Sequence, residues 1–389
     1  MPTLAALCAL ALLAQLGDGP DALDVMGMLH DQQRFHEQLD SSRWRSGPME
    51  HVDGVSAAVL QHPYTLLFDA DDASLLVASF TLNHVVRLRM VSRQARLNLA
   101  HPARPFGTYP DPARAAAQDA HRKTAAYKVF VSGRELDGPV GMALDGRHLY
   151  VASFTNDRIL RVDADSGDLL GTLGNDEELD CPEGIAISRG RLYVASFLLK
   201  HIVRYDLETG ECLGQFAPPP AGRPGPRDLG PRPTPLPSNS PTNSPRPPAL
   251  LGAEDVAIDD NGDLHVTAYH SNAVHKFNGT TGAFELEYGR GILRGPVGIA
   301  CGPGDGDMYV SSYRTHSVLR FSAGGKFVGV GAGAPPGAST AGRPLVANPS
   351  GLAFDPHDGT LHVLSYVSGA IVRFNATGDA RTRVWRLTR

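Results

Sequence analysis

The chain has 389 residues, a formal net charge of −5 and a hydrophobic fraction of 42%, enough to form a globular core. It has no excess of positive charge, so the composition disfavours nucleic acid and anionic membranes as partners. Length alone would allow two or three domains, so the internal pattern must decide the organisation.

Residues 1–20 contain an apolar run, Leu4 to Ala14, that has the length of a signal-peptide core and is too short to span a bilayer. The run lacks Lys and Arg, and the alternative is an N-terminal helix that packs under the rest of the chain. In residues 21–60, hydrophobic side chains at near-helical spacing predict a short helix. We expect a secreted or extracytoplasmic protein with no membrane span; a cytoplasmic location is the alternative.

One phrase occurs six times in residues 61–389. A hydrophobic pair, a small residue and an aromatic residue are followed by aliphatic residues and a base, and the copies read LLVASFTLNHVVRL, LYVASFTNDRILRV, LYVASFLLKHIVRY, LHVTAYHSNAVHKF, MYVSSYRTHSVLRF and LHVLSYVSGAIVRF. The small residues Ser153 and Ser196 are 43 residues apart, and Ala268 and Ser312 are 44 apart. This period indicates a repeat architecture, because one such unit cannot bury both of its faces alone.

Each unit contains four short runs with the composition of β-strands. In the second copy they cover residues 140–144, 149–154, 159–162 and 169–173, separated by Asp-Gly or Ser-Gly turns. Four antiparallel strands repeated six times predict an all-β fold, a six-bladed β-propeller of four-stranded blades.

Two insertions interrupt the repeat. Residues 90–124 separate the third and fourth strands of the first blade, and the Pro-rich residues 217–249 separate the third and fourth blades. The Pro-rich stretch predicts an extended, solvated segment. The sixth copy contains its own outer strand at residues 383–387, so we expect the ring to close by blade-on-blade packing and not by strand exchange; the alternative is that residues 52–60 add an edge strand.

Cysteines and glycosylation sequons give weak signals. The residues Cys181, Cys212 and Cys301 have no paired metal-type spacing, and we interpret them as small hydrophobic side chains. Asn278 and Asn375 begin acceptor sequons and are glycosylation candidates if the protein is exported, although Asn at such positions is also ordinary turn chemistry.

The segments SNAVHKFNGTTGAF at 271–284, RILRVDADSGDLLG at 158–171 and HIVRYDLETGECLG at 201–214 resemble NHL-type six-bladed propellers. The chain is most similar to an exported, largely uncharacterised subgroup. The wider group includes binding platforms of ubiquitin-ligase scaffolds and peptidyl-amide lyase modules, so the resemblance implies the architecture and not one activity. This chain has Ser-Phe or Ser-Tyr where typical NHL blades have Ala-Asp.

Residues that all blades share are best explained by packing. The aromatic residue of each copy would fill the space between neighbouring blades. The basic series would lie along the blades and pair with turn carboxylates such as Asp163, Asp206 or Asp259; its members are Arg87, Arg161, Arg204, Lys276, Arg320 and Arg373. Function should therefore be sought where the copies differ.

In a four-stranded meander, the start of the first strand and the turn between the second and third strands lie at the same end, so both line one mouth of the central channel. Two neighbouring blades place carboxylates at the first position: Glu183, and Glu254 with Asp255. Of the turn residues, we select Asp157, His201, His270, Asn272 and His316 as rim candidates, although exposed turns often collect such residues without a function.

These donors could hold a divalent cation. Oxygen ligands favour Ca²⁺ and imidazoles favour Zn²⁺, and Glu183, Glu254 and Asp255 are the candidate metal ligands. Alternatively, the paired Glu residues could act as acid and base.

Two functions remain. The first is a monomeric, non-enzymatic binding or scaffold module for a protein or glycan partner. The second is a metal-dependent hydrolase or lyase, similar to the gluconolactonase-type propellers. The resemblance to that family implies a Glu ligand in an inner strand of the first blade, and the corresponding stretch here, HPYTLLFD at 62–69, has none. The sequence therefore favours the binding module over the enzyme, and it identifies no catalytic residue.

Overall fold

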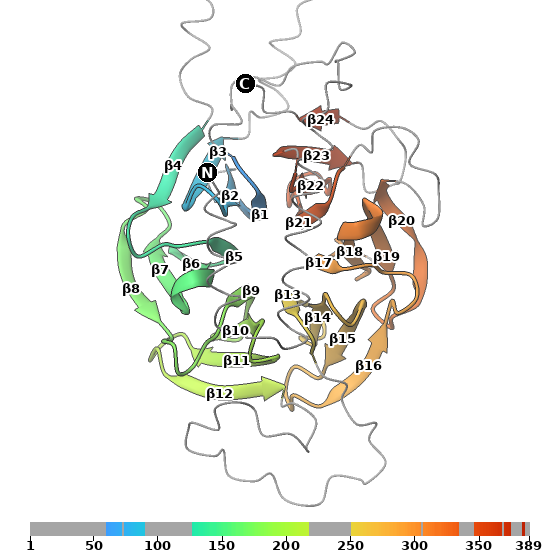
Figure 1. Ribbon diagram of the computed structural model, residues 1–389, viewed down its shortest axis with the longest axis horizontal. Coiled ribbons are helices and arrows are strands. Elements are labelled where there is room, and N and C mark those ends of the chain that lie inside the picture. The colour runs from blue at the N-terminus through green and yellow to red at the C-terminus, as the bar shows by residue number, and fades with distance from the viewer. Residues whose placement is uncertain are drawn as a thin grey trace, which may run out of the picture. The chain divides into compact units, whose positions relative to one another are not determined.

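The computed structural model describes residues 60–71, 74–89, 127–217, 250–304, 306–333, 346–367, 369–374 and 383–385. Their strands form six four-stranded antiparallel sheets that surround a common axis as blades (Figure 1). The all-β six-bladed propeller predicted from the repeat is confirmed. The predicted leader and N-terminal helix, the interiors of both insertions and the sequon at Asn375 lie outside the described residues.

Each blade uses four strands that follow one another in the chain. The blades are, in order, β1 (Pro63–Asp69), β2 (Ser74–Ser79), β3 (His84–Arg89) and β4 (Tyr127–Ser132); β5 (Pro139–Asp145), β6 (His148–Ser153), β7 (Arg158–Asp163) and β8 (Leu169–Leu173); β9 (Pro182–Ser188), β10 (Arg191–Ser196), β11 (His201–Asp206) and β12 (Cys212–Ala217); β13 (Ala253–Ile258), β14 (Leu264–Ala268), β15 (Ala273–Phe277) and β16 (Phe284–Tyr288); β17 (Pro296–Cys301), β18 (Met308–Ser312), β19 (Ser317–Phe321) and β20 (Phe327–Gly333); β21 (Pro349–Phe354), β22 (Leu361–Ser365), β23 (Ala370–Phe374) and β24 (Arg383–Trp385). Two short 3-10 turns, Phe154–Asn156 and Tyr313–Thr315, follow β6 and β18.

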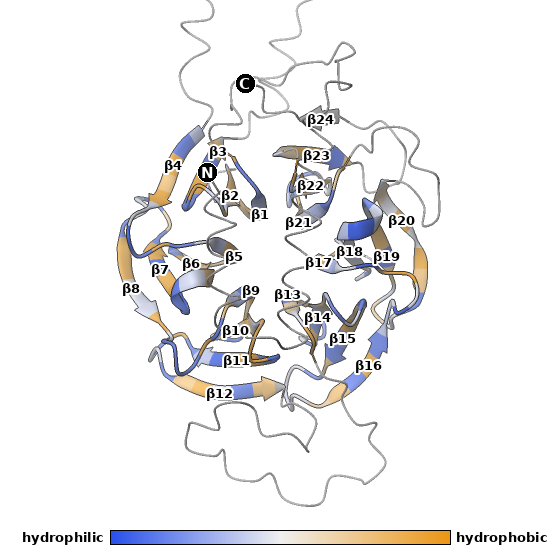
Figure 2. Ribbon diagram, in the orientation of Figure 1, coloured by the Kyte–Doolittle hydropathy of each residue, from blue (hydrophilic) through white to orange (hydrophobic). Residues whose placement is uncertain are grey.

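The second strand of every blade is buried along nearly its whole length, because blades pack against both of its faces. The fourth strands lie at the outside. Figure 2 shows hydrophobic stretches even there, as on β8, where Leu169 and Leu170 are 46% and 45% exposed.

The hydrophobic core consists of separate clusters, one at each junction between neighbouring blades, which we call seams. At the seam between blades 1 and 2, Leu76 and Val131 pack with Leu149. At the seam between blades 6 and 1, Leu364 and Ile371 belong to one cluster with residues of blade 1. Because every cluster draws on two blades, no blade buries its faces alone, as the repeat predicted.

The ring closes as expected, without strand exchange. In the sixth blade, β24 pairs with β23, so this blade has its own outer strand. Across the closing seam, Ser350 Oγ donates a hydrogen bond to the Pro63 carbonyl (2.8 Å), and the rings of His62 and Tyr366 stack at 4.8 Å. No helix among the described residues has the length and apolar character needed to cross a membrane.

Four members of the basic series lie in ion pairs within the blades, as predicted. Arg87 pairs with Asp69 at 3.2 Å, and Lys276 pairs with the predicted Asp259 at 3.2 Å. Arg320 pairs with Asp307, and Arg373 pairs with Asp358. The other two carboxylates expected to pair with the series, Asp163 and Asp206, pair instead with Arg147 and Arg191. Both carboxylates also accept backbone N–H groups of their own turns.

Candidate functional site

One face of the ring carries the predicted rim residues. The first strand of each blade starts where the second strand ends, as the pairing of Pro139 with Ser153 and of Pro182 with Ser196 shows. The turns between second and third strands therefore lie on the same face, which we call the mouth face.

The repeated serines fix, on this face, the end of each second strand to the entry of the first strand of the same blade. Ser153 Oγ accepts a hydrogen bond from the Asp137 N–H (2.8 Å) and donates one to the Asp137 carbonyl (3.1 Å). The same reciprocal pair joins Ser79 to Gln61, Ser196 to Asp180, Ser312 to Arg294 and Ser365 to Ala347. Blade 4 has Ala268 at this position and cannot form it. These hydroxyl groups are thus structural.

Three predicted rim residues form hydrogen bonds between blades. Asp157, Asn272 and His316 have left-handed backbone conformations, with φ of 52°, 52° and 56°. Their side chains accept N–H groups at the start of the next blade, at distances of 2.7, 2.7 and 3.0 Å; the donors are Cys181, Gly295 and Asn348. Asn83 does the same in blade 1 (2.8 Å), whereas Lys200 and Gly369 bring no acceptor group to this position.

The two remaining rim histidines are not brought together as a metal site. His201 Nδ1 lies 3.0 Å from the Leu199 carbonyl, and burial lowers the pKa of the ring to about 4, so the imidazole is neutral at pH 7. His270 packs edge to face on Phe197 and Tyr269, with centroids at 5.6 and 5.2 Å.

One small metal-type cluster does form on the mouth face. In the described part of the chain, the only group of three or more His, Cys, Asp or Glu ligand atoms within 4.8 Å of one another is Asp157, Asp180 and Cys181. Burial, followed by the charge of Asp180, raises the pKa of the Cys181 thiol, which makes it a poor nucleophile and a poor ligand. All three described cysteines are free, as expected.

The sequon at Asn278 forms a turn. The Asn278 side-chain oxygen accepts the N–H groups of Thr280 (3.1 Å) and Thr281 (3.0 Å), and its amide donates to Glu285 (3.2 Å). These contacts explain the residue by turn chemistry, and its glycosylation stays a prediction.

Aromatic rings surround the axis on the mouth face, above the seams. Tyr313 lies 5.9 Å from Tyr366 and 6.4 Å from Tyr269, both nearly edge to face. The Phe80 ring covers Gly138, where an added Cβ would lie only 2.9 Å from it. We call these rings the collar: Phe80, Phe154, Phe197, Tyr269, Tyr313 and Tyr366. The collar fills the space between neighbouring blades, as predicted.

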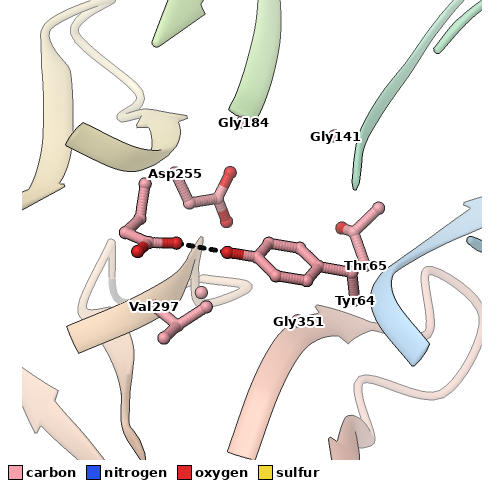
Figure 3. Close-up of a pocket in the computed structure, with 9 residues that line it drawn as sticks. Tyr64, Thr65, Gly141, Gly184, Asp255, Val297 and Gly351 are labelled. Atoms are coloured by element: carbon pink, nitrogen blue, oxygen red, sulfur yellow. Dashed lines mark hydrogen bonds between the residues drawn. The ribbon is translucent and has the colours of Figure 1, made fainter. Parts of the chain in front are cut away.

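Beneath the collar, Tyr64 and Glu254 border a small cavity in the channel (Figure 3), and Glu183 lies close enough to interact with both. The three residues hold equivalent positions, each being the second residue of its first strand. Tyr64 comes from blade 1 and its hydroxyl donates a hydrogen bond to Glu254 of blade 4. The same hydroxyl also interacts with Glu183 of blade 3. The phenol therefore joins inner strands that come from three blades.

Burial dominates the electrostatics of this group. It raises the pKa of Glu183 well above its usual value, and the charge of Glu254 raises it further, against a smaller effect of the Tyr64 hydroxyl. The pKa of Glu254 rises to about 8 for the same first reason. Burial also raises the pKa of Asp255 to about 6, although its carboxylate accepts the N–H groups of Ile299 (3.0 Å) and Val256 (2.9 Å).

The two glutamates were predicted as site residues from the sequence, but Tyr64 was not. In the matching stretch of blade 1, Tyr64 stands at the strand position that the two glutamates hold in blades 3 and 4. Aligning the second residue of all six first strands would have found it: Tyr64, Val140, Glu183, Glu254, Val297 and Ser350.

Comparison with known proteins identifies the fold only. No protein-family model matches the sequence, and no curated protein is similar enough to count as a relative. A streptogramin B lyase structure matches with a TM-score of 0.54 and 12% identity over 86% of each chain. A catalytically inactive virginiamycin B lyase from Staphylococcus aureus with quinupristin matches with a TM-score of 0.50 and 13% identity over 84% of each chain. At these identities the likeness supports the six-bladed propeller that the NHL-type resemblance implied.

Proposed function

We propose that this propeller is a binding module whose mouth face takes a positively charged segment of a protein partner. The observation that carries the proposal is a concentration of acids between β8 and β9. Asp176 and Glu177 are exposed there, and Glu178 and Asp180 follow them at the start of blade 3. We call residues 176–180 the acidic segment.

The acids of this region repel one another. The pKa of Asp157 rises to about 6, first because of burial and then because of the charges of Asp180 and Asp176. A cationic partner would relieve this repulsion, and surface charge of one sign speeds the encounter with a partner of opposite charge.

A protein partner fits these charges better than a neutral glycan. Lysine and arginine side chains bring the positive charge that the acidic segment attracts, whereas a neutral sugar gains nothing from it. The exported location, which would decide where such a partner is met, stays a prediction.

The test compares three probes by fluorescence anisotropy: a labelled lysine-rich peptide, its glutamate analogue and a labelled neutral oligosaccharide. We expect the lysine peptide to bind best and to weaken with added salt. The double variant Asp176→Asn with Glu177→Gln should lose about 1.4-fold to 5-fold in affinity per charge.

The matched control neutralises Glu208 and Glu211, which are exposed in the turn between β11 and β12, away from the mouth face. This control should bind like the wild-type protein. Equal binding of the lysine and glutamate peptides, or tighter binding of the oligosaccharide, would contradict the proposal.

A metal-dependent hydrolase or lyase is the second candidate, favoured by the raised pKa values of Glu183 and Glu254, since one could act as a proton donor. Its ligand set fits poorly, because Tyr64 occupies the blade 1 position that aligns with the two glutamates. Hydrolysis of a lactone or aryl ester that is lost in both Glu183→Gln and Glu254→Gln would favour the enzyme.

A further inference from the structure

We propose that the channel holds one hard divalent cation of the Ca²⁺ class, bound between the carboxylates of Glu183 and Glu254 next to the Tyr64 hydroxyl. This site lies beneath the collar and is separate from the acidic segment, so it does not depend on the proposed partner.

The two glutamates are held side by side by the backbone. Glu183 and Glu254 are the second residues of β9 and β13, the first strands of neighbouring blades. These strands approach so closely that a Cβ on Gly184 would lie 2.4 Å from the Asp255 Cα and 2.7 Å from the Glu254 carbonyl oxygen. Glycine at 184 therefore permits the contact that brings the carboxylates together.

Each carboxylate has one buried oxygen atom without a hydrogen-bond partner. Glu183 is 4% exposed and Glu254 only 1%. The unsatisfied atoms are Glu183 Oε2 and Glu254 Oε1, whereas Glu254 Oε2 accepts the Tyr64 hydroxyl. A buried carboxylate oxygen without a donor is costly, so these two atoms point to a ligand.

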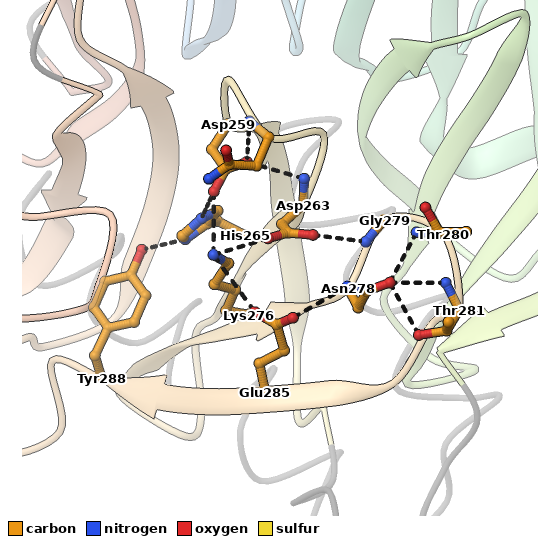
Figure 4. Close-up of polar contacts among 11 residues, drawn as sticks. Asp259, Asp263, His265, Lys276, Asn278, Gly279, Thr280, Thr281, Glu285 and Tyr288 are labelled. Atoms are coloured by element: carbon orange, nitrogen blue, oxygen red, sulfur yellow. Dashed lines mark hydrogen bonds and ion pairs between the residues drawn. The ribbon is translucent and has the colours of Figure 1, made fainter.

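The described residues that line the cavity beside Glu254 supply no counter-charge. They are Tyr64, Thr65, Gly141, Gly184, Glu254, Asp255, Val297, Gly298 and Gly351, and they contain no Lys, Arg or His. A nearby cluster in blade 4 shows the contrast. There the carboxylates of Asp259, Asp263 and Glu285 surround Lys276, which brings a positive charge of the chain among them (Figure 4).

The donor atoms and the space select the ligand class. All the donors are oxygen atoms, the choice of Ca²⁺ and Mg²⁺, and two carboxylates match a charge of +2. Asp255 uses its oxygens for the N–H groups of Val256 and Ile299, so it is not assigned as a ligand. The cavity beside Glu254 has a volume of about 10 Å³ and glycines from four blades in its wall, which suits a single ion and leaves no room for an organic cation.

The experiment uses the full chain after removal of metal with EDTA. Addition of CaCl₂ should raise the melting temperature by several degrees, and calorimetry should find one ion per chain in this site. Tb³⁺, a luminescent substitute for Ca²⁺, should be sensitised by the neighbouring tyrosines and displaced by Ca²⁺. The titration should extend to about 5 mM, because extracellular calcium sites can be as weak as 10⁻³ M.

The variants Glu183→Gln and Glu254→Gln keep the side-chain shape and should weaken Ca²⁺ and Tb³⁺ binding at least 100-fold. Their metal-free melting temperatures should equal or exceed that of the wild type, which separates loss of the site from misfolding. Glu285→Gln is the control, because Glu285 lies beside Lys276 and not in the channel. This variant should keep the full response to Ca²⁺.

Three results would overturn the proposal. One is a wild-type protein that responds to neither Ca²⁺, Mg²⁺ nor Tb³⁺, which would leave a shared proton as the neutralising group. The second is a preference for Zn²⁺ over Ca²⁺. The third is an unchanged response in both glutamine variants, which would place the ion elsewhere. Peptide binding by the acidic segment is measured separately, so either proposal can fail alone.

Discussion

Blade 4 contributes to two groups of carboxylates, and the two groups differ in their counter-charge. In the first, the Lys276 ammonium lies 3.2 Å from Asp259, 3.0 Å from Asp263 and 3.5 Å from Glu285. In the second, Glu183 and Glu254 are buried in the channel, and the Tyr64 hydroxyl interacts with both. The first group has a cation of the chain at its centre. The residues that line the cavity beside Glu254 include none, so the second group depends on a proton or a ligand.

The pKa directions express the same contrast. Burial alone would lower the pKa of Lys276, but its hydrogen bonds to Asp263 and Asp259 raise it above the usual value, so the ammonium is retained. Burial raises the pKa of Glu183, where no cation opposes it. The predictions below test this difference from the largest expected effect to the smallest.

Replacing Lys276 by Met should remove the cation that lies among Asp259, Asp263 and Glu285. Asp259 would remain buried without its cation, and removal of one partner of a buried ion pair costs about 3–5 kcal/mol. Urea unfolding would measure the loss of free energy of unfolding, with Lys326→Met, at an exposed lysine, as the control. Equal stability of the two variants would show that the Lys276 network contributes little.

Glu183→Gln should change stability in the opposite direction. Burial raises the pKa of Glu183 well above its usual value, so ionising this carboxyl destabilises the metal-free fold, and glutamine removes that cost. The free energy of unfolding should therefore rise relative to the wild type, by about 1.4 kcal/mol for each pH unit above the ordinary pKa until the raised pKa is reached. The same urea experiment measures it, beside Glu208→Gln at an exposed site. A destabilised Glu183→Gln protein would mean that the channel pair already has a counter-charge within the chain.

Asp157→Asn tests a carboxylate that is only partly buried and is in contact with solvent. Asparagine can still accept the Cys181 N–H, as Asn83 and Asn272 do for equivalent groups. The folded pKa of Asp157, about 6, lies above the ordinary 3.8, so its charge destabilises the fold increasingly as pH rises from about 4 to 6. We expect a gain of about 1 kcal/mol at pH 7, after allowance for solvent screening, and none below pH 4.

Thermal unfolding between pH 3.5 and 7.5 would follow this difference. An effect of the same size at every pH would assign it to packing and not to charge.

Ala268→Ser should have the smallest effect and leaves all charges unchanged. The new hydroxyl can form with Leu251 the reciprocal pair that five other blades have, which adds about 0.5–1.5 kcal/mol. It would fix the entry of β13 to the end of β14 within blade 4, and Ca²⁺ binding should not change. Ser153→Ala is the reverse experiment and should destabilise. A destabilised Ala268→Ser protein would show that blade 4 has no room for the hydroxyl.

The sequence predicted the fold well because the repeat reports local requirements. In the second copy, the predicted runs 140–144 and 169–173 correspond to β5 (Pro139–Asp145) and β8 (Leu169–Leu173). Departure from the repeat also identified Glu183 and Glu254, since a carboxylate at this inner-strand position stands out against the Val and Ser of other copies.

The rest of the site depends on contacts across the ring. Tyr64 looks like an ordinary aromatic residue of a strand, and only the closed ring brings its hydroxyl to Glu254, 190 residues away. Asp157, Asn272 and His316 look like exposed turn residues. Their left-handed backbone turns them toward the next blade, a tertiary effect that spacing along the chain does not show.

The contiguity of each blade in the chain affects how the ring can open. Among the described residues, all the strand pairings join strands of one blade, and the closing contacts between blades 6 and 1 come from side chains and ring stacking. The ring can therefore part at a seam while these β-ladders stay paired. In hydrogen exchange, we expect amides within the ladders to stay protected during such an opening. The amides that donate to side chains across a seam, those of Gly138, Cys181 and Gly295, would be the first to lose protection.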